Sequence, residues 1–113
     1  MGHEIVILVE NIDVCRYFYR EVLQIGELVA DSNNRVVFAI GEKAFLVLEK
    51  SAVNFMERAS GAVRMAFECD DVSALQARMI KDGSRLSDSF ERLGKSCYRG
   101  CDPEGNPFFV WQK

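Results

Sequence analysis

The apolar positions of the chain change their period in the same order twice. An alternating run at 4–9 precedes helically spaced apolar residues over 12–23, and the same order begins again at 63–69. Asn11 and Asp71 stand just before the two helical patterns, where a short polar side chain can accept a hydrogen bond from the first turn. The pattern predicts a strand followed by an amphipathic helix near the start of each half.

Three further strands are expected after each helix. Gly83 is expected to end the second helix in a left-handed conformation, and Asp102-Pro103-Glu104-Gly105-Asn106 is a strong turn. The predicted strands are 27–30, 35–40 and 44–49 in the first half, and 85–90, 96–101 and 107–112 in the second. The chain is therefore expected to hold two βαβββ modules, at 3–50 and 62–113, with a connector at 51–61 that contains one helical turn.

Size and charge narrow the class of protein. A chain of 113 residues fits one domain, 1–113, in which the two modules share a core. Neither a signal peptide nor an apolar run of membrane length is seen, so we expect a cytoplasmic protein without a membrane partner. The net charge of -3 and the sequence pI near 5.2 argue against a nucleic-acid partner, which usually needs a basic stripe.

The four cysteines do not indicate a zinc site. Cys15, Cys69, Cys97 and Cys101 form no CxxC pair, and the only histidine is His3. We expect reduced thiols, with Cys15 and Cys69 packed as small apolar residues between helix and sheet. A nucleophilic cysteine or a Ser-His-acid triad is not expected, because no histidine accompanies the candidate groups.

Two motifs carry a resemblance to a known family. They are Val9-Glu10-Asn11 with Phe18-Tyr19-Arg20-Glu21-Val22-Leu23 in the first half, and Asp102-Pro103-Glu104-Gly105-Asn106 before the last strand. Here the chain resembles the vicinal-oxygen-chelate superfamily, which includes glyoxalase I, extradiol dioxygenases, methylmalonyl-CoA epimerase, and fosfomycin- and bleomycin-resistance proteins. The resemblance implies an α+β fold, with curved mixed sheets around a cavity, and generally a homodimer. It names no single activity, because one scaffold can host many.

The resemblance also implies where a metal would be held. The metal-dependent members place ligands, usually histidine and glutamate, on four inward strand positions, which here are Glu4, Val47, Arg64 and Phe109. Only Glu4 could donate to a divalent ion, since Val47 and Phe109 have no donor atom and Arg64 is permanently charged. The usual metal centre is therefore expected to be absent.

A displaced metal site is the alternative. A slip of one residue turns a strand over, so a bulge could bring His3 to the side of Glu4, while Glu49 and Glu68 also occupy inward faces. Zn, Ni, Mn or Fe held by these four residues would make the protein a divalent-metal-dependent lyase, isomerase or dioxygenase.

Strand alternation predicts the lining of the cavity. The expected ligand-binding residues are Glu4, Phe45, Val47, Glu49, Arg64, Glu68, Phe109 and Trp111. They form an aromatic wall with an acidic fringe and Arg64 as the lone cation, and of Tyr98 and Arg99 on a flanking strand only one can point inward. The opposite faces are assigned to the core: Ile5, Ile7, Val9, Leu46, Leu48, Met65, Phe67, Phe108 and Val110.

Three functional hypotheses follow from this lining. The first is a metal-free protein, similar to the bleomycin-resistance branch and its role in antibiotic resistance, which sequesters an aromatic or cationic small molecule. The second is the metal enzyme described above. The third is a structural or regulatory interaction module whose pocket is filled by its own side chains.

Overall fold

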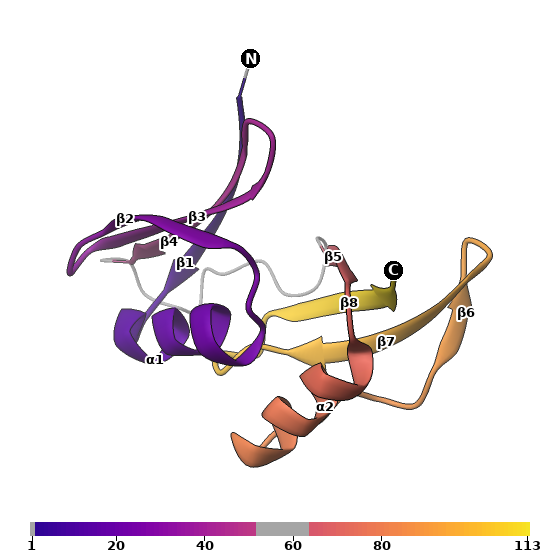
Figure 1. The fold of residues 1–113 in the computed structure, drawn as a ribbon. Helices are drawn as coiled ribbons and strands as arrows, with labels where there is room; N and C mark the ends of the chain where they lie inside the picture. The colour runs from indigo at the N-terminus through magenta and orange to yellow at the C-terminus, as the bar shows by residue number, and fades with distance from the viewer. Residues whose placement is uncertain (1, 52–63) are drawn as a thin grey trace. The chain divides into compact units, whose positions relative to one another are not determined.

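The computed structural model describes residues 2–51 and 64–113, and the chain divides into two compact units, Met1–Arg58 and Ala59–Lys113. In each unit the described residues include one four-stranded mixed sheet and one α-helix (Figure 1). The predicted α+β class with two βαβββ modules is confirmed. That the two modules share one core stays a prediction.

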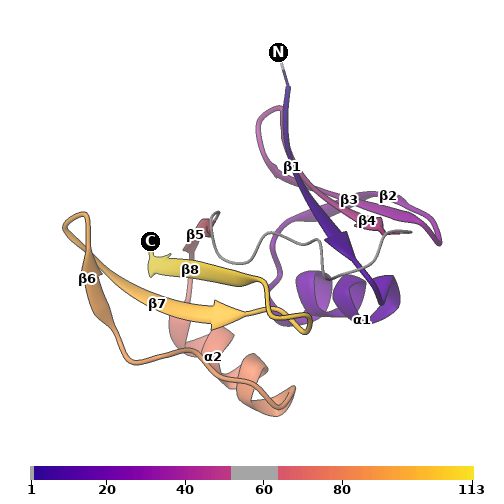
Figure 2. The same ribbon diagram turned by 180° about the vertical axis from the view of Figure 1, so that it is seen from behind.

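The first unit contains β1 (His3–Val9), α1 (Ile12–Tyr17), the π-helical turn η1 (Phe18–Val22), β2 (Glu27–Asp31), β3 (Arg35–Gly41) and β4 (Ala44–Lys50). The second contains β5 (Met65–Cys69), α2 (Val72–Lys81), β6 (Phe90–Arg92), β7 (Lys95–Cys101) and β8 (Pro107–Gln112). The strand orders, β1-β4-β3-β2 and β5-β8-β7-β6, are the same arrangement twice, with one parallel pair in each sheet (Figure 2).

The helix of the first unit departs from the single α-helix predicted over 12–23. Asn11 caps it as expected, accepting a hydrogen bond from the Val14 N–H at 3.2 Å, but from Phe18 the backbone widens into a π-helical turn. The Leu23 N–H donates to the Phe18 carbonyl at 2.8 Å. Two adjacent rings, Phe18 and Tyr19, are both buried, with their centroids 5.4 Å apart in an edge-to-face contact. A π-bulge of this kind is a local change that the apolar spacing does not reveal.

One face of each sheet is buried together with the helix of its own unit. In the first unit Val9, Leu46 and Leu48 are buried with the α1 residues Ile12 and Cys15. In the second, α2 begins after the predicted cap Asp71, ends before Gly83 at φ 89°, and buries Leu75 and Met79 with Phe108 and Val110. The predicted core is confirmed at most positions, except that Ile5 is 40% exposed and Phe67 is only half-buried.

The strand predicted at 85–90 is wrong for most of its length, because only Phe90 belongs to a strand. The preceding segment has no regular ladder and is held by side chains and by one backbone hydrogen bond, which the Ser87 N–H donates to the Arg99 carbonyl at 2.8 Å. Gln76 of α2 accepts from the Leu86 N–H at 2.8 Å and donates to the Leu86 carbonyl at 3.4 Å. The Ser87 hydroxyl oxygen accepts from the Arg99 N–H at 2.9 Å.

Three other expectations concern the remainder of the chain. The helical turn expected in the connector at 51–61 lies outside the described residues, which include only Ser51 of that segment. Cys15, Cys69, Cys97 and Cys101 are free thiols, with Cys15 buried and Cys69 half-buried as predicted. Within residues 2–51 and 64–113, the helices are too short and too polar to cross a lipid bilayer.

The turn between β7 and β8 is organised by the buried carboxylate of Asp102. One oxygen, Oδ1, accepts from the backbone N–H groups of Glu104 and Asn106, each at 2.9 Å, and Oδ2 accepts from the Asn106 side-chain amide at 2.8 Å. The Asp102 N–H in turn donates to the Asn106 carbonyl at 2.9 Å. This network sets the start of β8, the strand that carries Phe109 and Trp111.

We expect Asp102→Ala to lower the free energy of unfolding by about 2–4 kcal/mol, because it leaves two backbone donors unpaired at a buried site. Urea unfolding followed by circular dichroism measures this loss. The matched control is Glu42→Ala, which removes an exposed acid from the β3–β4 turn and should change the stability by less than about 0.5 kcal/mol. Equal effects of the two substitutions would contradict the role given to Asp102.

Candidate functional site

The face of the first sheet opposite α1 is largely apolar. The parallel register aligns Glu4 with Phe45 and Val6 with Val47. Val6 remains 47% exposed, Phe45 is half-buried, and Val47 is fully buried. The predicted first-module residues Glu4, Phe45, Val47 and Glu49 therefore share one sheet face, as alternation requires.

The acids on this face have a cation that the sequence interpretation missed. Arg35 of β3 lies opposite Glu49 in the antiparallel register, with 3.9 Å between its Nε and the Glu49 carboxylate. Its Nη2 lies 3.5 Å from Glu4. All three side chains are about half exposed, so each pair contributes less than about 1 kcal/mol. The pairing nevertheless offsets part of the acidic fringe that the sequence predicted for this module.

The corresponding face of the second sheet carries three aromatic rings, Phe90, Phe109 and Trp111, which we call the aromatic face. Phe109 lies beside Ala66 and Trp111 beside Glu68 across the β5–β8 pair. Phe90 of β6 meets Phe109 at 5.6 Å between ring centroids, in an edge-to-face contact. All three rings are only half-buried, whereas Phe108 on the other side of β8 is fully buried.

Three cations lie against these rings. Arg92 stands 5.1 Å from the centroid of Phe109, Lys95 stands 4.4 Å from that of Trp111, and Arg99 stands 5.7 Å from that of Phe90. All three belong to the β6–β7 hairpin. Of the flanking pair Tyr98 and Arg99, it is Arg99 that lies on the aromatic face, so Arg64 is not the lone cation that the sequence predicted.

Phe90, Arg92 and Lys95 were not predicted as site residues because the hairpin was misplaced. The sequence predicts strands at 85–90 and 96–101, and therefore a loop over 91–95 between them. A signal was present in Leu93-Gly94, a two-residue turn in which both residues have positive φ, 51° and 75°. Such a turn matches the twist of a tight hairpin and pairs Phe90 with Cys97 and Arg92 with Lys95.

The four positions that the family resemblance marks for a metal do not provide a ligand set. Glu4 and Val47 stand on the first sheet, Arg64 and Phe109 belong to the second unit, and only Glu4 has a donor atom suited to a divalent ion. Phe109 is also packed against Phe90 and Arg92. In residues 2–51 and 64–113 there is no group of three or more histidine, cysteine, aspartate or glutamate side chains that could hold a metal.

The displaced metal site is not assembled either. The β1–β4 register runs from His3 to Val9 without a bulge, so His3 and Glu4 point to opposite faces. Glu4 and Glu49 both face Arg35. The bulge that would bring His3 beside Glu4 is absent from the described β1 strand.

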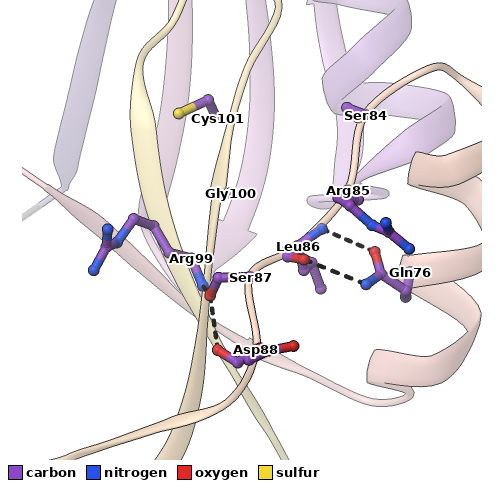
Figure 3. A pocket seen from close by; sticks show the side chains of 9 residues that line it. All are labelled: Gln76, Ser84, Arg85, Leu86, Ser87, Asp88, Arg99, Gly100 and Cys101. Carbon is purple, nitrogen blue, oxygen red and sulfur yellow. Dashed lines mark hydrogen bonds between the residues drawn. The ribbon is translucent and has the colours of Figure 1, made fainter.

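A separate depression of about 580 Å³ lies where the segment after α2 runs along β7 (Figure 3). Its lining includes Gln76, Ser87, Asp88, Arg99 and Cys101. Gln76 is already hydrogen-bonded to both backbone groups of Leu86, and the Ser87 hydroxyl donates to the Asp88 carbonyl at 2.8 Å. These groups hold the segment in place, which leaves the aromatic face as the stronger candidate site.

Comparison with known proteins identifies the fold. No family profile matches the sequence, and no curated protein is significantly similar to it. Among solved structures, the antibiotic-binding protein TnmS3 of Streptomyces sp. CB03234 is similar at 23% identity with a TM-score of 0.76, over 99% of this chain and 94% of that one.

Two other similar structures have different described roles. A glyoxalase/bleomycin resistance protein from Streptomyces sp. CB03234 is 23% identical, with a TM-score of 0.74, over 99% of this chain and 100% of that one. Lactoylglutathione lyase from Agrobacterium tumefaciens is 21% identical, with a TM-score of 0.68, over 99% of this chain and 92% of that one. The chain therefore has the vicinal-oxygen-chelate fold, as its two motifs predicted. Sequence identities of 21–23% show that the fold is shared, but they do not show a shared activity.

The contact between Lys95 and Trp111 can be measured by a double-mutant cycle. We expect Lys95→Met, Trp111→Leu and the double variant to show a coupling of about 0.5–1 kcal/mol in the free energy of unfolding, because an exposed cation over an indole ring is stabilising by that amount. Guanidinium unfolding followed by circular dichroism gives the three values. The same cycle with Lys81 of α2 should give no coupling. Absence of coupling for Lys95 would mean that the ammonium does not rest on the ring in solution.

Proposed function

We propose that this is a metal-free small-molecule-binding protein that sequesters a flat aromatic ligand on the aromatic face. The supporting observation is the half-burial of Phe90, Phe109 and Trp111 on the side of the sheet opposite α2. Stacking on such rings gives about 0.5–1.5 kcal/mol for each contact beyond the burial of apolar area. The site in this proposal adds Phe90 to the second-module residues expected from the sequence, which were Arg64, Glu68, Phe109 and Trp111.

Four further residues proposed to bind the ligand, Glu4, Phe45, Val47 and Glu49, lie on the first sheet. Phe45 is half-buried and offers apolar area, whereas Val47 is fully buried, and the charges of Glu4, Arg35 and Glu49 lie on the same face. Apolar walls with a small number of placed polar groups are the usual form of a small-molecule site.

The comparisons support binding as one of the roles this fold can serve. TnmS3 is described as an antibiotic-binding protein, and at 23% identity it shares the architecture with this chain. Lactoylglutathione lyase, an enzyme by its name, also shares the architecture, with a TM-score of 0.68. The choice of binding over metal-dependent catalysis rests on the donor atoms of this chain, because Val47, Arg64 and Phe109 stand where ligands are implied.

We further propose that the protein works as a cytoplasmic homodimer in antibiotic resistance. The four free thiols suit a reducing compartment. β1 and β5 are edge strands of their sheets, and an edge offers unpaired backbone groups to another strand. Sedimentation velocity of the purified protein tests this part directly, with a monomer at micromolar concentration counting against it.

The ligand site is tested with anthracenemethanol, an uncharged flat probe. Trp111 is the only tryptophan, so quenching of its emission reports occupancy of the aromatic face. We expect Phe109→Ala to weaken binding about tenfold, because it removes one ring contact worth about 1.4 kcal/mol while keeping the reporter. Calorimetry provides the same affinity without fluorescence.

The matched control for Phe109→Ala is Tyr17→Ala, which removes an exposed ring from α1. This variant should bind anthracenemethanol as the parent does. If Phe109→Ala and the parent bind equally, or if the parent does not bind the probe, the aromatic face is not the ligand site.

Metal binding separates the proposal from a metal enzyme. We expect titration calorimetry with Zn²⁺, Ni²⁺, Mn²⁺ and Fe²⁺ to show no tight stoichiometric binding, since the implied ligand positions offer a single carboxylate. Elemental analysis of the purified protein should agree. One tightly held ion per chain that is lost in Glu4→Gln would overturn the proposal in favour of the enzyme.

A further inference from the structure

We infer that the aromatic face selects anionic aromatic molecules, those that carry a carboxylate or an acidic phenolate on a flat ring system. This inference rests on the proposed function and reverses the charge of ligand that the acidic fringe had suggested. The inference follows from the positions of Arg92, Lys95 and Arg99 beside the rings. It also follows because these three residues form no ion pair with any described residue.

The β6–β7 hairpin positions all three cations. The tight turn at Leu93-Gly94 makes β6 and β7 a hairpin, and alternation then puts Arg92, Lys95 and Arg99 on the side that carries Phe90. Each charged group approaches a different ring, at 4.4–5.7 Å from its centroid. The hairpin therefore borders the stacking surface with positive charge. A ring bound there would have its substituents next to these groups.

Among residues 2–51 and 64–113, no carboxylate forms an ion pair with these three charges. In the first unit, by contrast, Arg35 stands near two carboxylates, and Arg16 donates to Asp13 at 2.6 Å and to Asp31 at 2.8 Å. The hydrogen bond to Asp13 is the main cause that raises the pKa of Arg16. The hairpin cations have no such partner among the described residues.

The N–H groups of Arg92, Lys95 and Arg99 can still donate hydrogen bonds to a ligand while these side chains contact the rings. A guanidinium that lies near an aromatic ring still has N–H groups directed from its edge, which can bind a carboxylate in a forked arrangement. The Lys95 ammonium likewise has three donors, and it lies over the Trp111 ring without an ion pair to any described residue. An acidic ligand would gain charge-assisted hydrogen bonds without breaking an existing ion pair.

The remaining charges on this face orient such a ligand. The sheet order is β5-β8-β7-β6, so Glu68 on β5 lies beside Trp111 on one side of β8, and the hairpin lies on the other. Arg64 lies at the start of β5, on the Glu68 face by alternation. The acidic group of the ligand is directed away from Glu68 toward Arg92 and Arg99. A cationic ligand would meet three positive charges there that have no ion-pair partner in the part of the chain that the structure describes.

A matched series of three probes tests the inference: anthracenecarboxylate, anthracenemethanol and anthracenemethylammonium. They share one ring system and differ in the charge of one substituent. We expect the carboxylate to bind about tenfold more tightly than the alcohol, and the ammonium to bind least tightly, with the preference shrinking as salt is added. Affinities are measured by titration calorimetry and by quenching of Trp111.

Charge variants then locate the preference. Arg92→Gln and Arg99→Gln should each lower the affinity for the carboxylate about threefold or more, with the affinity for the alcohol nearly unchanged. Glu68→Gln should raise the affinity for the carboxylate. The control Lys81→Gln removes the same charge from α2 and should alter neither affinity. Unchanged binding of the alcohol also shows that each variant is folded.

The outcomes distinguish the two proposals. If the alcohol binds and the carboxylate binds no more tightly, the charge selectivity is wrong while the aromatic site stands. If the carboxylate preference survives in both arginine variants, the hairpin is not its source and the inference is overturned. If none of the three probes binds, the proposed function itself fails.

Discussion

The alternation of side chains along each strand is the constraint on which the rest of this structure depends. Because one face of each sheet is buried with a helix of its own unit, every second residue is committed to a core, and the residues between them form the opposite face. Phe108 and Phe109 illustrate the division, since the first is fully buried and the second is only half-buried. Neither ring could change roles without a slip of register that would also move its neighbours.

The same constraint explains what could be predicted from the sequence. The repeated strand and helix, the caps Asn11 and Asp71, and the turn around Asp102 each have a local signature, so the modules could be recognised from short segments. The predicted core also followed from alternation, apart from Ile5 in β1, which is exposed, and Phe67 in β5, which is half-buried. The capping and turn residues, together with the spacing of the apolar residues, were sufficient to predict an element wherever it ends in a conventional cap or turn.

Other features depend on contacts between segments that a local pattern does not contain. The expected strand at 85–90 failed because Leu86 is bonded by Gln76, ten residues earlier, instead of by a neighbouring strand. Arg35 came to the Glu4 face through the β3–β4 register, and Arg92 through a hairpin whose turn has leucine at a position with positive φ. Phe109 and Trp111 could therefore be placed on one face from the sequence, whereas Phe90 and the cations beside these rings could not. The neighbours of these cations are determined only when the strands pair.

The two open faces differ in how their charges are arranged. On the first sheet the acids stand beside Arg35, whereas on the second the basic groups stand over rings and have no acidic partner among the described residues. A ring attracts a cation without cancelling its charge, because the ring itself is neutral. The second sheet therefore keeps a positive potential above an apolar surface. A surface of this kind discriminates by charge as well as by shape.

The tight β6–β7 hairpin also has an evolutionary consequence. It carries Arg92 on the edge strand β6 and Lys95 and Arg99 on the adjacent strand β7, outside the buried layer formed by α2 with β8. Exchanges of the exposed residues Lys95 and Arg99 would change the charge beside the aromatic face at little cost to folding, as expected for exposed positions. Descendants of one ancestor could thus acquire new chemical preferences by altering a few neighbouring codons while the scaffold stays the same.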